Sequence, residues 1–234
     1  MAPDFLDFFS LCFSLTLFAG YHVYLRWRLR HDPFHTSHAV NSFARTKWVE
    51  TIMSSEKRDV LAVQTLRNSV MASSFMASTS ILLMIGTLTL SGSTSSSSIW
   101  HALNVGGATN QTLLAFKLVM LLADFFVAFF CFSMAVRFFN HTGYMINVPM
   151  QLGVTALSPH RVAAYLNRAG NFYVYGTRSF FYCVPLVFWI FGPHLMIIAT
   201  LVLIVGLYRL DRVPSGVRYK AQMEHDDGGG EDEA

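Results

Sequence analysis

The stretch LLAFKLVMLLADFFVAFF, residues 113–130, is apolar enough to lie in a lipid bilayer, yet it contains Lys117 and Asp124. A spanning helix needs about 20 mainly apolar residues, and a charge at its centre costs roughly 2.5–3.5 kcal/mol on insertion scales. Lys117 lies about one turn from the start of the stretch, so its long stem can carry the ammonium back to the headgroups. Asp124 is too short to do so. It therefore needs a polar partner, trapped water or a proton.

The whole chain has the composition of a membrane protein. Of its 234 residues, 53% are hydrophobic and 13% are charged, whereas a soluble domain carries about 25% charged residues. The sequence contains no phosphate-binding loop, dinucleotide fingerprint or convincing metal-ligand motif, so we expect no resident cofactor and no metal. Its basic residues lie where membrane topology requires them, which gives no support to nucleic-acid binding.

Four stretches are long and apolar enough to span a bilayer: residues 5–25, 61–90, 113–139 and 180–208. The sequence therefore predicts an all-α fold, a polytopic membrane helix bundle with four transmembrane helices over residues 1–213. The remaining residues, 214–234, end in EHDDGGGEDEA. Such an acidic, glycine-rich segment cannot bury a core, so it is predicted to be a disordered tail.

Between the first two spans, the apolar side chains of a further segment fall on one helical face: Val40, Phe43, Ala44, Trp48 and Ile52. This pattern predicts an amphipathic helix at the cytosolic membrane interface. Lysine and arginine favour cytosolic loops. Residues 26–59 hold seven of them, residues 137–179 hold four, and residues 91–112 hold none. Loops 26–60 and 137–179 are therefore predicted to be cytosolic and loop 91–112 non-cytosolic, in the plasma membrane or an endomembrane.

The last span leaves an alternative open. Four spans place both termini on the non-cytosolic side, although Arg209 and Arg212 favour the cytosol. A re-entrant hairpin turning at Gly192-Pro193 returns the tail to the cytosol, but the two halves of residues 180–208 are each too short to span a bilayer. We favour four full spans.

Several polar residues are predicted to turn inward. Gln64, Arg67 and Asn68 share one helical face at spacings i, i+3 and i+4. His194 follows Pro193 in the last span, where it either relays protons or is hydrogen-bonded at a kink. The predicted intramembrane polar cluster comprises Gln64, Arg67, Asn68, Lys117, Asp124, Arg178 and His194.

The chain resembles plant members of an integral-membrane family catalogued as domain of unknown function 599. Five segments carry the resemblance: YHVYLRWRLR, RTKWVETIM, DVLAVQTLRNSVMASS, AVRFFNHTGYMINVP and NRAGNFYVYGTRSFFYCVPLVFWIFGP. The resemblance covers residues 5–212. It implies a multi-pass membrane protein from a plant, supports the span count, and assigns no catalytic residue.

Three classes of function fit these observations. The first is a small channel, transporter or transport subunit, in which the polar cluster lines a path and the bundle is oligomeric because four helices enclose little space. The second is a non-catalytic scaffold or accessory subunit that binds anionic lipid headgroups or a membrane partner. The third, a membrane-embedded enzyme, fits least well because no nucleophile and base converge at one depth. We favour transport.

Overall fold

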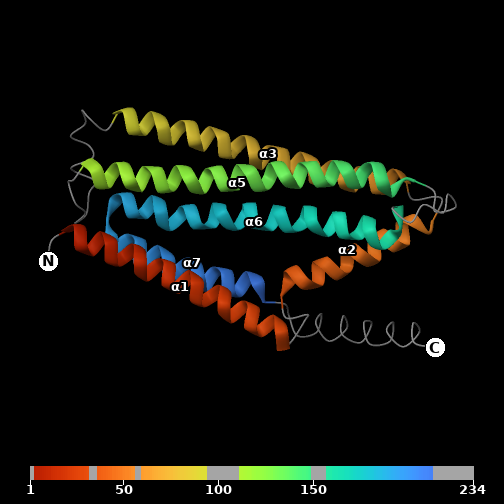
Figure 1. The fold of residues 1–234 in the computed structure, drawn as a ribbon, viewed down its shortest axis with the longest axis horizontal. Helices are drawn as coiled ribbons and strands as arrows, with labels where there is room; N and C mark the ends of the chain where they lie inside the picture. The colour runs from red at the N-terminus through yellow and green to blue at the C-terminus, as the bar shows by residue number, and fades with distance from the viewer. Residues whose placement is uncertain (1–2, 32–35, 56–58, 94–110, 149–156, 213–234) are drawn as a thin grey trace.

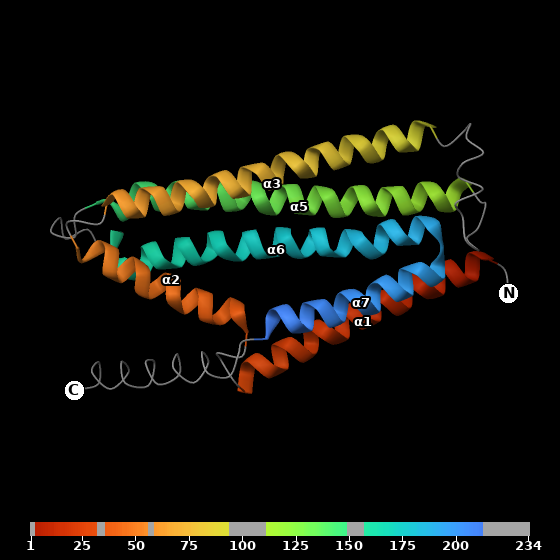
Figure 2. The same cartoon turned by 180° about the vertical axis from the view of Figure 1, so that it is seen from behind.

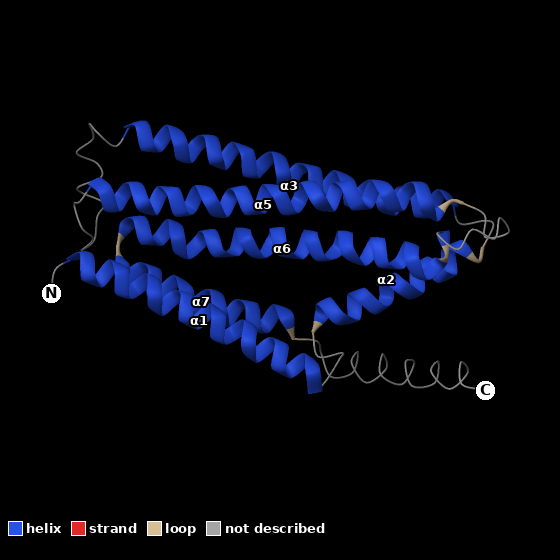
Figure 3. Ribbon diagram, viewed as in Figure 1, coloured by secondary structure: helices blue, strands red, loops and turns tan. Residues whose placement is uncertain are grey.

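The computed structural model describes residues 3–31, 36–55, 59–93, 111–148 and 157–212, and within them it is helical without a strand (Figures 1 and 3). The all-α class is confirmed. The helices are α1 (Pro3–His31), α2 (Ser37–Met53), α3 (Asp59–Ser93), α5 (Gln111–Ile146), α6 (Pro159–Phe191) and α7 (Pro193–Asp211). The predicted disordered tail, residues 214–234, and nearly all of the serine-rich loop lie outside the described residues.

Five of these helices, α1, α3, α5, α6 and α7, are long and apolar enough to cross a membrane. The count of four spans is therefore not confirmed, and the single span over residues 180–208 is wrong. α6 ends at Phe191 and α7 begins at Pro193, because proline lacks a backbone N–H and disfavours the helical region for the residue before it. Neither half is short, since α6 begins at Pro159, twenty-one residues earlier than the apolar run suggests.

The spanning helices form a row. α3 packs on α5, α5 on α6, α6 on α7, and α7 on α1 (Figures 1 and 2). The amino end of α1, the start of α5 and the turn from α6 to α7 lie at the same end of the molecule. α1 and α7 diverge from α6 towards the opposite end. α1 thus packs chiefly on α7 and stands away from the backbones of α5 and α6.

Helix length divides the molecule into two parts. α3, α5 and α6 have 35, 36 and 33 residues, which corresponds to about 50–54 Å at 1.5 Å per residue. α7 has 19 residues, about 28 Å, which matches the hydrocarbon core of a bilayer. α2 lies beside the additional length of α6 (Figure 2).

α2 is confirmed as a helix, but its buried face differs from the predicted one. Val49 and Ile52 are buried in a core shared with α3, α5 and α6, whereas Ala44 is exposed. The buried face of α2 is rotated from the predicted one because α6 also presents polar side chains to α2. Arg45 Nε donates a hydrogen bond to Asn167 Oδ1 of α6 at 2.9 Å. Arg45 therefore lies inward, against Gly170.

The contact between α5 and α6 depends on a glycine. The ring of Phe132, which is fully buried, points at Gly176. A Cβ atom at position 176 would lie 2.8 Å from Phe132 Cζ, closer than carbon atoms pack. Phe132 also contacts the rings of Tyr173 and Phe180 on α6, so it has little room to move. Glycine at this position lets the two helices approach.

We therefore expect Gly176→Ala to lower the melting temperature of the detergent-solubilised protein, because overpacking a filled core costs about 1–3 kcal/mol. Gly86→Ala on α3 is the matched control, since its added Cβ meets nothing within 4 Å. That variant should melt at or above the wild-type temperature, as alanine favours helix by about 1 kcal/mol. Equal melting of Gly176→Ala and wild type would show that Phe132 can move aside.

Candidate functional site

A buried ion pair joins α1 to α5. Lys117 Nζ lies 2.7 Å from Asp7 Oδ1, with side-chain exposures of 4% and 0%. Trp189 of α6 completes the group: its indole Nε1 donates to Asp7 Oδ1 at 2.8 Å, and its carbonyl oxygen accepts from Lys117 Nζ at 3.0 Å. The ammonium also lies 5.2 Å from the centroid of the Trp189 ring. We call these three residues the α1 clamp.

The clamp corrects the interpretation of Lys117. Its ammonium does not reach outward to the headgroups but turns inward to Asp7. Two opposite charges in a low-dielectric interior attract strongly, and hydrogen bonds from Trp189 meet part of the cost of desolvating them. Asp7 escaped the sequence reasoning because it stands at the start of the first apolar run, where a charge is ordinarily solvated.

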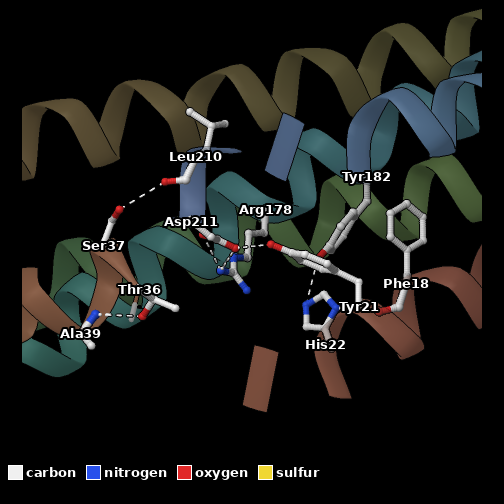
Figure 4. Close-up of polar contacts among 10 residues, drawn as sticks. All are labelled: Phe18, Tyr21, His22, Thr36, Ser37, Ala39, Arg178, Tyr182, Leu210 and Asp211. Carbon is white, nitrogen blue, oxygen red and sulfur yellow. Dashed lines mark hydrogen bonds and ion pairs between the residues drawn. The ribbon is translucent and has the colours of Figure 1, made fainter. Parts of the chain in front are cut away.

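A second network fastens the opposite end of the α1–α7 pair to α6 (Figure 4). Arg178 Nη2 of α6 lies 2.9 and 3.0 Å from the two carboxylate oxygens of Asp211 on α7. The Tyr21 hydroxyl of α1 donates to Asp211 Oδ2 at 2.6 Å. Arg178, Asp211 and Tyr21, the basal network, thus link three helices through one carboxylate.

His22 and Tyr182 form a further bridge between α1 and α6. His22 Nδ1 lies 2.9 Å from the carbonyl oxygen of Phe18, and His22 Nε2 lies 3.0 Å from the Tyr182 hydroxyl. A carbonyl oxygen can only accept, so Nδ1 carries a proton and donates it to Phe18 O. Figure 4 shows the two side chains meeting between their helices.

Asp124 lies on α5 against the part of α6 that carries Arg178 and Tyr182. The Ser179 hydroxyl lies 2.7 Å from Asp124 Oδ1 and donates to it. Asp124 Oδ2 is buried and has no hydrogen-bond partner among the described residues, and no described cation forms an ion pair with Asp124. The sequence-based requirement of a polar partner is thus met for one oxygen, by Ser179 rather than by Arg67.

Two cavities meet at Asp124. The polar one, about 430 Å³, is also lined by Arg26, His38 and Arg178. The apolar one, about 450 Å³, lies between α1 and the helices α5, α6 and α7. His22, Asp124, Val127 and Tyr182 line both. Each volume falls within the range of about 300–1,000 Å³ that small-molecule sites occupy.

The structure does not bring Gln64, Arg67 and Asn68 to Asp124. All three are exposed on α3. The buried stripe of α3 runs instead through small or apolar residues at heptad-like spacing, namely Ala62, Leu66, Ser73, Ala77 and Ser80. Close packing on α5 selects these small residues, so the polar face is turned away from the bundle.

His194 is exposed in the first turn of α7, immediately after the break between α6 and α7. It lies at a helix end and not at mid-span, because the predicted fourth span is two helices. Of the predicted cluster, Asp124 and Arg178 thus share the polar cavity, Lys117 belongs to the clamp, and the other four residues lie elsewhere.

Sequence reasoning missed Asp7, Tyr21, His22, Tyr182 and Asp211. A signal for some of them is present in α1, where Asp7, Ser10, Ser14 and Tyr21 are buried. Their spacings of three, four and seven residues place them on one helical face, which marks a polar stripe turned inward. No comparable spacing identifies Asp211, which follows the apolar run of α7.

Basic groups surround the polar cavity on the α2 side. Burial lowers the pKa of His38 below its ordinary value of 6.5, and the positive charges of Arg45 and Arg178 lower it further. A side-chain hydrogen bond with Asn171 and the charge of Asp211 oppose this shift more weakly. Burial also lowers the pKa of Arg45. Among the described histidines, cysteines and acidic residues, no three lie close enough to hold a metal ion.

Comparison with known proteins identifies the family. Residues 9–215 match the family described as "Protein of unknown function, DUF599". The chain belongs to this family, as its resemblance predicted, and its five apolar helices mark it as an integral membrane protein. No curated protein and no solved structure gives a significant match. An origin in a plant stays a prediction.

We expect Lys117→Met and Asp7→Asn each to destabilise the protein strongly, because removing one partner leaves the other charge buried, a loss of about 3–5 kcal/mol. The double variant should recover much of that loss. Thermal unfolding of all four proteins gives the coupling energy by a double-mutant cycle. Additive losses would mean that the two charges do not interact.

Stability should also depend on His38. Its lowered pKa means that the folded protein binds a proton there more weakly than the unfolded chain, so the stability contributed by neutral His38 is lost as pH falls below about 6.5. His38→Gln should make the melting temperature decline less over this range. The control is His194→Gln, at the exposed end of α7. Its melting temperature should decline with pH as that of the wild type does. Parallel curves for wild type and His38→Gln would contradict the assignment.

Proposed function

We propose that this protein is a small membrane transport protein, a channel, transporter or transport subunit, whose substrate site is the cavity at Asp124. The observation that carries the proposal is the buried Oδ2 of Asp124, which has no hydrogen-bond partner among the described residues and lies beside two cavities that share part of their lining. An ionisable residue within a spanning helix ordinarily serves an ion or substrate pathway. Ser179 donates a hydrogen bond to Oδ1 of Asp124, so Oδ2 is left to accept a ligand.

The other spanning carboxylates differ from Asp124. Asp7 is paired with Lys117, and Asp211 is paired with Arg178. These pairs hold helices together, whereas Asp124 receives a hydrogen bond only from Ser179 among the described residues. A carboxylate that serves the fold alone would gain from a second donor. This contrast separates the candidate site from the structural networks.

Helix number supports an orientation. With five spans, the two termini lie on opposite sides of the membrane, and Arg209 and Arg212 fall on the same side as Arg26 and Arg28. The positive-inside rule then places this end in the cytosol. α2 and the additional turns of α3, α5 and α6 would project on the cytosolic side, so Arg67 need not enter hydrocarbon.

The proposal is tested by Asp124→Asn, which keeps the shape of the side chain and removes its charge. Wild-type protein in vesicles on a solid-supported membrane should give a transient current after a jump in pH or in the concentration of potassium or of an alkylammonium salt. We expect Asp124→Asn to lose at least about nine tenths of that current, which corresponds to roughly 1.4 kcal/mol, while keeping its melting temperature.

Phe126→Leu is the matched control, because Phe126 lies two positions along the same helix with its ring exposed. It should keep the wild-type current. No current with any of the three jumps, or an equal current in Asp124→Asn, would contradict transport through this site.

The alternative is a non-catalytic scaffold, and one observation favours it: the clamp pairs Asp7 with Lys117, and the basal network pairs Asp211 with Arg178. A scaffold predicts that Asp124→Asn either leaves every property unchanged or reduces the yield of folded protein. The current and the size-exclusion profile of Asp124→Asn, measured together, therefore separate the two functions.

A further inference from the structure

We propose that the ligand of the Asp124 cavity is a monovalent organic cation that carries an apolar chain, an amine or quaternary ammonium with an alkyl group. This inference rests on the proposed function, because it names the class of molecule for the same site. Charge, cavity shape, aromatic lining and access support it.

The charge of the site favours a cation. Asp124 is the one acidic side chain within the described spans that lacks a cationic partner, since Asp7 and Asp211 are paired. A bound cation neutralises the carboxylate in a medium of low dielectric. An anion would add a second negative charge beside it, which is the more costly arrangement.

The shape of the site requires an apolar part. Beyond Asp124, the second cavity is lined chiefly by hydrophobic side chains, among them Leu11, Leu15, Phe18, Met120, Leu186 and Met196. This cavity is about 450 Å³ in volume, far more than a bare metal cation or proton needs. An alkyl group of a ligand bound at Asp124 would bury apolar surface there, at roughly 25 cal/mol per Å².

Aromatic rings line the junction between the carboxylate and the apolar cavity. The rings of Phe18 and Tyr182 lie 4.9 Å apart and are tilted by 56°, and both residues line the apolar cavity with Asp124. Aromatic faces attract organic ammonium groups by cation–π interaction, which strengthens when the groups are desolvated. A carboxylate beside aromatic rings therefore suits an ammonium better than a hydrated metal ion.

Access is more favourable from the bilayer than from water. Leu15 of α1 and Val127 of α5 both line the apolar cavity and are about half exposed, so this cavity opens to the outside between two spanning helices. By contrast, the exposed guanidinium of Arg26 lines the polar cavity, and its positive charge repels a cation approaching from water. An alkyl ammonium partitions into the bilayer and can enter from the side.

The test uses the full-length protein in lipid nanodiscs, titrated calorimetrically with hexyltrimethylammonium, hexanoate, hexanol and tetramethylammonium, with empty nanodiscs subtracted. We expect saturable binding of hexyltrimethylammonium, and affinities at least about tenfold lower for the other three. Asp124→Asn should lower the affinity for hexyltrimethylammonium by a similar factor, whereas Phe126→Leu should leave that affinity unchanged.

A second variant keeps the test decisive if Asp124→Asn folds poorly. Leu15 lines the apolar cavity, and a tryptophan at this position on α1 should occupy part of it. Leu15→Trp should therefore lower the affinity for hexyltrimethylammonium without changing the affinity for tetramethylammonium. Stronger binding of hexanoate, or binding that neither variant weakens, would overturn the inference. Asp124-dependent currents without amine binding would reject this ligand class and leave transport standing, whereas amine binding without any current would support the ligand class and reject transport.

Discussion

A charge buried among hydrocarbon and protein must find its counter-charge within the chain, and the pair formed by Asp7 and Lys117 shows what this constraint does to the fold. α1 packs on α7 and approaches α5 and α6 mainly through side chains. The α1 clamp therefore fixes the first helix at one end of the molecule. Without it, the only extensive contact of α1 would be with α7.

The cavities follow from this arrangement. The clamp holds the α1–α7 pair to α5 and α6 at one end, and the basal network with the His22–Tyr182 bridge ties it to α6 further along. Between and beside these attachments the helices are separated, and side chains leave two cavities there. Asp124 lies beside the His22–Tyr182 bridge, where the two cavities share lining residues. A closely packed bundle, like the contact of α5 with α6 at Gly176, would leave no room for a ligand.

Close packing between helices explains why several polar residues of α3 that were predicted to lie inside are exposed. α3 presents Ala62, Ser73 and Ala77 to α5, because small side chains allow helices to approach closely. Its polar groups then face outward along a helix longer than a bilayer is thick. The core around Val49 and Ile52 shows that this additional length is itself packed, with α2 as its cover.

The sequence alone determined the all-α class, the membrane location, three of the spans and the need of Asp124 for a partner, because hydropathy and the cost of a buried charge are local properties of the chain. It offered a turn at Gly192-Pro193 only as an alternative to a single span, and it did not show that two spanning helices meet there, since the polar residues of 159–179 conceal the first part of α6. Only the tertiary structure decided which charges meet. Asp7 and Lys117 are 110 residues apart, and no pattern within either helix indicates that the two share a depth and a face.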